Sequence, residues 1–152
     1  MKKRKKYLVI LLVPFVIFNC IFIYDQIKNR RFHQFEKEIK TDFSFIDKIE
    51  LGNFGPYCAL YVYVDEDSCS YTEIEEAFIR IMIEVSSEDN FQYFLERHNR
   101  DASGELTFFD VTFYKKGEDD KALYRYSSCK NFQVWKLEGE SDKTYNITEY
   151  NK

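Results

Sequence analysis

The pattern of hydrophobic and polar positions begins with an apolar run over residues 7–24, which contains no charged side chain. A helix of this length reaches about 27 Å at ~1.5 Å per residue, close to the hydrocarbon thickness of a bilayer. Tyr7 and Tyr24 stand at its two ends, where interfacial aromatic residues collect. We therefore predict a transmembrane anchor at 7–24, preceded by a basic cytoplasmic tail over residues 1–6.

Two other interpretations of this run compete with the anchor. A cleaved signal peptide ends in a small-residue site, but no Ala, Gly or Ser occurs before residue 44. A lipoprotein would carry its lipid on Cys20, although Ile17–Cys20 matches a lipobox only loosely and the chain stays apolar beyond it. The uncleaved anchor is therefore favoured. The dense basic residues of 1–6 predict a cytoplasmic N-terminus and an extracytoplasmic C-terminal domain.

Beyond a charged stretch at 25–40, predicted to be a juxtamembrane helix or stalk, the pattern changes to short alternating segments. A first strand is predicted near 43–51, followed by a Gly- and Pro-containing turn at 52–56. The next strand, 57–64, alternates most clearly. Cys58, Leu60, Val62 and Val64 lie on one face, opposite Tyr57, Ala59, Tyr61 and Tyr63. Such a strand suits a sheet with one face in the core and the other partly covered.

Two helices are predicted in the middle of the chain. Ser70 with Glu73 matches a capping box, in which the hydroxyl and the carboxylate satisfy free backbone donors. A helical stripe follows at Ile74, Phe78, Ile81, Met82 and Val85. Alternation over 79–85 also fits a strand, but the cap favours a helix. A change of phase after it predicts a second helix over 88–98.

Three further strands are predicted at 105–115, 122–128 and 131–137, with a hairpin turn at 116–120. Residues 138–152 form a polar C-terminal segment that is expected to fray, unless its apolar side chains dock. Those side chains are Tyr145, Ile147 and Tyr150.

The element order is therefore ββααβββ. It predicts an α+β fold with a small antiparallel sheet and helices packed on one face, preceded by one N-terminal transmembrane helix. Residues 41–137 make up the predicted extracytoplasmic domain.

Composition and charge narrow the classes of function. Hydrophobic residues make up 45% of the chain and aromatic residues 18%, which favours a packed domain over a disordered one. The chain has a net charge of −4, but residues 41–152 hold 12 basic and 23 acidic side chains, a net charge of −11. A domain this acidic is a poor candidate for binding nucleic acid, whereas a cationic partner, or simple solubility, fits its sign.

Candidate chemistry is sparse. Cys69 and Cys129 lie at element ends and are the candidate disulfide pair if the compartment is oxidising, whereas Cys58 is assigned to the core. The alternative is that all three cysteines are unpaired. His98, with Asp101 and Ser103 nearby, has the residue types of a catalytic triad, but neighbours in sequence do not make a triad in space. We therefore predict no enzyme activity, no catalytic or metal-binding residues and no cofactor.

The most promising surface in the sequence is a tyrosine-rich face. Its members are Tyr57, Tyr61, Tyr63, Tyr124 and Tyr126. Tyrosine offers apolar area with a polar tip, which suits recognition of a peptide or a sugar. The partner that we expect is a protein or peptide at the cell envelope. The alternative is that helices or the C-terminal segment cover this face.

The sequence thus predicts a membrane-anchored, non-enzymatic interaction module. Its alternatives are an immunity-type or assembly protein that shields a membrane partner, a spacer behind an active anchor, and a lipoprotein or small envelope enzyme without a recognisable motif.

Overall fold

The computed structural model describes residues 17, 19–20, 29–118, 120–129, 132–139 and 143–150. The chain divides into two compact units, Met1–Lys37 and Glu38–Lys152. The predicted anchor lies outside the described residues except at residues 17, 19 and 20, and within the described part no helix is long and apolar enough to cross a membrane. The predicted stalk is helical over its described part, residues 29–40, and this helix continues to residue 42.

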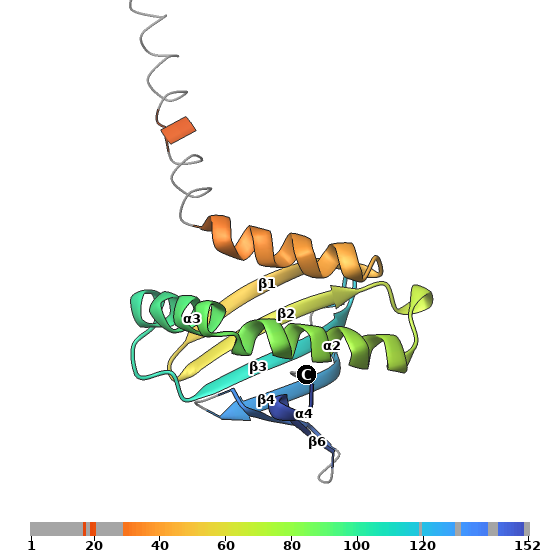
Figure 1. The fold of residues 1–152 in the computed structure, drawn as a ribbon. Helices are drawn as coiled ribbons and strands as arrows, with labels where there is room; N and C mark the ends of the chain where they lie inside the picture. The colour runs from red at the N-terminus through yellow and green to blue at the C-terminus, as the bar shows by residue number, and fades with distance from the viewer. Residues whose placement is uncertain are drawn as a thin grey trace, which may run out of the picture. The chain divides into compact units, whose positions relative to one another are not determined.

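The second unit is an α+β domain built on one six-stranded sheet, in which the strands lie side by side in chain order (Figure 1). The strands are β1 (Ile46–Phe54), β2 (Tyr57–Val64), β3 (Phe108–Lys115), β4 (Ala122–Cys129), β5 (Val134–Leu137) and β6 (Thr144–Asn146). The helices are α2 (Tyr71–Ser86), α3 (Glu88–Asp101) and α4 (Ile147–Tyr150), with a short 3₁₀ turn at Glu66–Ser68. The predicted α+β class is thus confirmed.

The prediction of an antiparallel sheet was wrong for one strand pair. β2 and β3 are parallel, with Tyr57 opposite Phe108 and Val64 opposite Lys115, whereas the other neighbours are antiparallel. Parallel strands need a crossover connection, and here α2 and α3 carry the chain back to the end of the sheet where β2 began. The sheet is therefore mixed.

The turn between β1 and β2 is shorter than predicted. Strand β1 runs on through Gly52 to Phe54, and only Gly55 and Pro56 connect it to Tyr57. Gly55 has a φ of 54°, the left-handed region that two-residue hairpin turns require and that glycine enters without a steric penalty. Gly52 serves another purpose, because a Cβ there would lie 2.8 Å from Cε2 of Tyr61.

The predicted helix at α2 is confirmed, including its cap. The Glu73 N–H donates to Ser70 Oγ at 3.3 Å, and the Ser70 N–H donates to Glu73 Oε2 at 2.7 Å. The apolar stripe is buried, together with Ala77. The capped helix packs this stripe on the sheet. The alternative of a strand over 79–85 was therefore wrong.

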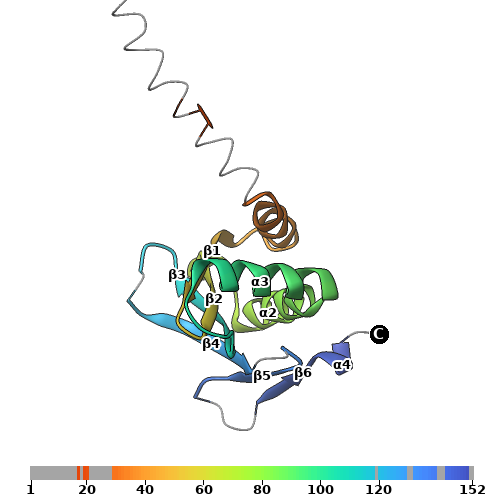
Figure 2. The same cartoon turned by 90° about the vertical axis from the view of Figure 1, so that its left-hand side faces the viewer.

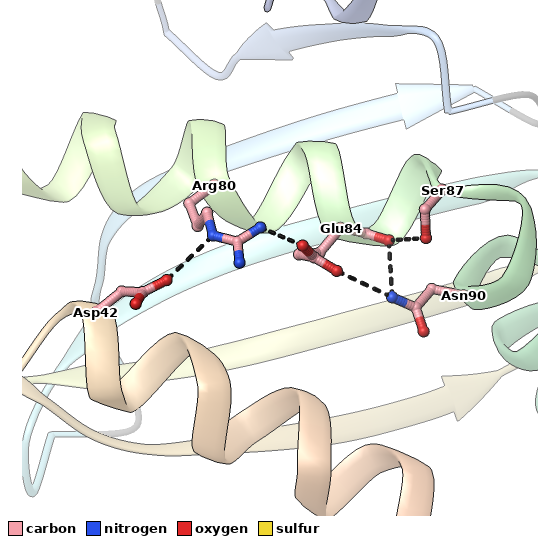
Figure 3. A network of polar contacts seen from close by, with 5 residues as sticks. All are labelled: Asp42, Arg80, Glu84, Ser87 and Asn90. Atoms are coloured by element: carbon pink, nitrogen blue, oxygen red, sulfur yellow. Dashed lines mark hydrogen bonds and ion pairs between the residues drawn. The ribbon is translucent and has the colours of Figure 1, made fainter. Parts of the chain in front are cut away.

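Polar contacts set the joint between α2 and α3, as Figure 3 shows. The Glu84 carbonyl accepts hydrogen bonds from Ser87 Oγ at 2.7 Å and from Asn90 Nδ2 at 3.0 Å, which satisfies the end of α2. Arg80 pairs with the Glu84 carboxylate and, through Nε at 3.1 Å, with Asp42. The charged side chains of this network are partly exposed, and each has a partner of opposite charge, so their role is to stabilise the fold.

The main core lies between one face of the sheet and α2 with α3 (Figure 2). The ring of Phe78 from α2 stacks on Tyr126 at 3.7 Å and meets Trp135 edge-on at 5.7 Å. Phe94 from α3 contacts Phe109 at 5.3 Å. Each fully buried aromatic side chain of this kind stabilises the fold by about 1.5–3 kcal/mol.

The described part of the C-terminal segment, residues 138–139 and 143–150, belongs to this domain, so the expected fraying was wrong there and the docking alternative holds. Tyr145 and Ile147 are buried, and the Tyr145 hydroxyl donates to Glu75 Oε1 at 2.6 Å. Lys143 Nζ pairs with the same carboxylate at 2.9 Å. Burial raises the pKa of Glu75, but these two hydrogen bonds outweigh it and hold that pKa below its ordinary value of 4.5. Polar contacts to α2 that the sequence pattern does not reveal therefore fix β6 in place.

Candidate binding surface on the open face of the sheet

The face of the sheet opposite α2 and α3 carries the best candidate site, and we call it the open face. Its residues follow from the two-residue period of a strand and from the strand register. They are Lys48, Glu50, Gly52 and Phe54 of β1, Tyr57, Ala59, Tyr61 and Tyr63 of β2, Phe108, Asp110, Thr112 and Tyr114 of β3, and Arg125 of β4.

An aromatic ladder crosses three strands at one end of the open face. Phe54 stacks on Tyr57 with ring centroids 5.6 Å apart, and Tyr57 stacks on Phe108 at 5.0 Å. The planes of each pair are within 20° of parallel. Phe54 ends the ladder on the edge strand and remains 51% exposed, so the ladder offers apolar surface to solvent.

Three tyrosines form a second cluster further along the open face. Tyr114 lies 5.7 Å from Tyr63 and 6.1 Å from Tyr61, measured between ring centroids. The Tyr63 hydroxyl donates to Glu50 Oε2 at 3.2 Å, and Lys48 Nζ lies 4.2 Å from the centre of the Tyr63 ring. These contacts hold the rings in place without a covering helix.

An ion pair joins β3 to β4 beside these two clusters. Arg125 Nε donates to Asp110 Oδ2 at 3.2 Å, and Nη2 donates to the same oxygen. Asp110 is only 3% exposed although it lies on the open face, whereas the Arg125 side chain is 43% exposed. The Glu138 carboxylate approaches Arg125 at 3.6 Å. The hydrogen bond to Asp110 raises the pKa of Arg125, so the guanidinium stays charged.

A cavity of about 210 Å³ opens between the tyrosine cluster and this ion pair. It is lined by Phe54, Ala59, Tyr61, Asp110, Thr112, Tyr114, Ala122, Arg125 and Glu138. Burial raises the pKa of Tyr61, and the neighbouring Tyr114 and Asp110 raise it further, so its phenol stays protonated at neutral pH. The cavity therefore offers ring surfaces, hydroxyl groups and carboxylates, and its chemistry suits binding.

The predicted tyrosine face is divided between the two sides of the sheet. Tyr57, Tyr61 and Tyr63 lie on the open face as predicted. Tyr124 and Tyr126 lie on the helix-covered face, because β4 sets them opposite Phe113 and Val111 of the core. There Tyr126 stacks on Phe78 and Tyr124 contacts Tyr71 at 5.0 Å. They take part in packing, as the covered-face alternative supposed.

Several residues of the open face were not singled out from the sequence, among them Phe54, Phe108, Asp110, Tyr114 and Arg125. Alternation did place Phe108 and Asp110 opposite the apolar side of their strand. The missing information was the parallel pairing of β2 with β3, which brings that side into line with the tyrosines of β2.

The predicted disulfide pair is not brought together. Cys69 is a free thiol that donates to the Asp65 carbonyl at 3.4 Å, beyond the far end of β2. Cys129 pairs with Phe108, at the end of the sheet where β2 begins, and its side chain lies outside the described residues. Eight-residue strands at ~3.3 Å per residue hold these ends about 20 Å apart, far beyond disulfide reach. Cys58 is buried as predicted, and burial raises the pKa of its thiol.

His98, Asp101 and Ser103, which have the residue types of a catalytic triad, are not arranged as one. Asp101 pairs with Arg97 and Arg100 instead. His98 is fully buried, and neither ring nitrogen has a hydrogen-bond partner among the described residues. In the described part of the chain, no group of three His, Cys, Asp or Glu side chains is arranged to hold a metal ion.

Comparison of the chain with family models, with curated proteins and with solved structures found no match. A functional assignment therefore rests on the geometry of the open face.

Proposed function

We propose that this chain is a membrane-anchored, extracytoplasmic binding protein that holds a protein partner against its open face and performs no catalysis. The observation that carries the proposal is a partly exposed aromatic surface on a sheet face that α2 and α3 do not cover. The partly exposed side chain of Arg125 lines the same cavity as some of these rings.

The composition of this face supports a protein partner. Tyr, Phe and Arg are enriched at the centres of protein interfaces, and Tyr and Arg often carry much of the binding energy. Here three strands position the rings, and ring stacking limits their rotation before any partner arrives. Binding therefore loses little side-chain entropy, which favours affinity.

The proposed location rests on the sequence of the N-terminal region. An uncharged run at 7–24 follows five consecutive basic residues, which is typical of an anchor with a cytoplasmic N-terminus. Protease treatment of intact cells tests it. We expect fragments of 41–152 to be released while the N-terminal segment stays in the membrane. Protection of the domain until the membrane is broken would show the opposite orientation.

A photo-cross-linking amino acid at position 54 tests the binding surface in the full-length chain in its native membrane. Tyr150 is the matched control, because it is an exposed aromatic residue on α4, away from the open face. We expect a discrete cross-linked protein from position 54 and none from position 150. No adduct at 54, or the same adducts at both positions, contradicts the proposed function.

A further inference from the structure

We infer that the cavity beside Asp110 receives a cationic side chain, a lysine ammonium or an arginine guanidinium, from the partner polypeptide. This inference rests on the proposed function and names the chemistry of its recognition.

The first argument comes from the hydrogen bonding of Asp110. Both contacts from Arg125 fall on Oδ2, and no described residue pairs with Oδ1. Asp110 is 3% exposed as a residue, but its Oδ1 is not enclosed without a partner as the ring nitrogens of His98 are, so this oxygen stays accessible from the cavity. Because Asp110 lines the cavity, a donor that enters it can complete the hydrogen bonding of this carboxylate.

The second argument comes from the aromatic walls. Tyr61, Tyr114 and Phe54 line the same cavity, and the faces of aromatic rings attract cations. The fold already uses such contacts: Lys48 Nζ lies 4.2 Å from the centre of the Tyr63 ring, and Lys143 Nζ lies 4.6 Å from that of Tyr71. A cation in the cavity would thus contact a carboxylate and aromatic rings together.

The third argument is the balance of charge. The cavity holds two carboxylates, Asp110 and Glu138, and one cation, Arg125, which both carboxylates already approach. An anionic group would meet two like charges, and an apolar group would bury Asp110 Oδ1 without a partner. The net charge of −11 over residues 41–152 also attracts a basic partner at long range. A cation meets two opposite charges and one like charge, Arg125, so the net charge of the cavity favours a cation over the other occupants.

Capped nine-residue peptides that differ only at the central residue test the inference. The central residue is lysine, Nε-acetyl-lysine, norleucine or glutamate, and each labelled peptide is titrated by fluorescence anisotropy against the full-length chain in mild detergent. We expect the lysine peptide to bind at least tenfold more tightly than the acetyl-lysine and norleucine peptides, and the glutamate peptide to bind most weakly.

Asp110→Asn and Tyr114→Leu, together with one control variant, connect this preference to the cavity. Asp110→Asn keeps the shape of the side chain, and we expect it to lower the affinity for the lysine peptide at least tenfold. Glu50→Gln is the matched control, because Glu50 lies on the same face but is already paired with Lys48 and Tyr63. Tyr114→Leu removes a cavity wall while keeping the carboxylate, so it keeps the test informative if Asp110→Asn does not fold.

The outcomes separate this inference from the proposed function. Equal binding of the lysine and acetyl-lysine peptides, or equal losses in Asp110→Asn and Glu50→Gln, overturns the cationic site. If no peptide binds while position 54 still cross-links a partner, the cationic site is overturned and the binding surface stands. If the lysine peptide binds as expected but position 54 cross-links nothing, the cavity is cation-selective and the proposed partner surface is overturned.

Discussion

The two faces of the sheet carry similar residues but use them differently. On the helix-covered face, Phe78, Tyr126 and Trp135 interlock and are excluded from water. On the open face, the ladder through Phe54 stays partly exposed, as do Tyr61 and Tyr114 of the tyrosine cluster, and the ion pair of Asp110 and Arg125 joins β3 to β4 beside them. The difference shows that a core is identified by contacts from a second layer, here α2 and α3, and not by aromatic content.

The largest loss of stability is expected from a substitution in the core on the helix-covered face. Phe78→Ala removes a ring that contacts Tyr126, Trp135 and Tyr145, and leaves a cavity. We expect the free energy of unfolding to fall by about 3–5 kcal/mol, measured by chemical denaturation. A loss below ~1 kcal/mol would contradict the assignment of this face to the core.

A smaller effect concerns how the helix side holds the C-terminal segment. Glu75→Gln removes the charge that pairs with Lys143 and accepts from Tyr145, and we expect a loss of about 1–2 kcal/mol at neutral pH. Because the pKa of Glu75 in the folded protein lies below 4.5, its contribution is full above that pH and is lost as the pH falls through the folded value. Denaturation curves from pH 7 to pH 3 should therefore be less pH-dependent in the variant than in the original chain. Identical pH dependence in both proteins would show that this carboxylate does not stabilise the segment.

Substitution of the buried His98 is expected to change the free energy of unfolding in the opposite direction. His98 has no hydrogen-bond partner for either ring nitrogen among the described residues, so its polar atoms are desolvated without compensation. We expect His98→Met to leave stability unchanged or raise it by up to about 1 kcal/mol, measured by thermal unfolding. A loss of more than ~2 kcal/mol would indicate that the imidazole has a partner.

The smallest loss of stability is expected from a substitution on the open face, where it should instead affect binding. Phe54 is half exposed, so Phe54→Ser should lower the free energy of unfolding by less than about 1 kcal/mol, mainly through its lost stack on Tyr57. The same substitution should abolish recovery of the partner when the chain is isolated from membranes. Tyr150→Ser provides the control, with both stability and recovery retained.

Much of the secondary structure could be predicted from the sequence, and the limits of that prediction are specific. The cap at Ser70, the alternation in 57–64 and the stripe in α2 are local signals, and all three led to correct elements. Strand β6 was missed because Thr144–Asn146 is too short for a pattern and is held by Glu75, about seventy residues away in sequence. The grouping of Tyr124 and Tyr126 with the other tyrosines failed because the phase of a returning strand depends on its register.

By itself, the sequence determined the elements with strong local signals, which side of β2 and of β3 is apolar and how the acidic charge is distributed, since these follow from neighbouring residues and composition. Only the tertiary structure decided that β2 and β3 run parallel, because the direction of a crossover depends on how α2 and α3 pack. That pairing brings Tyr61, Asp110 and Arg125 together on one surface. A binding surface assembled from separate strands exists only when the register is set, and the register is set by packing over the whole sheet.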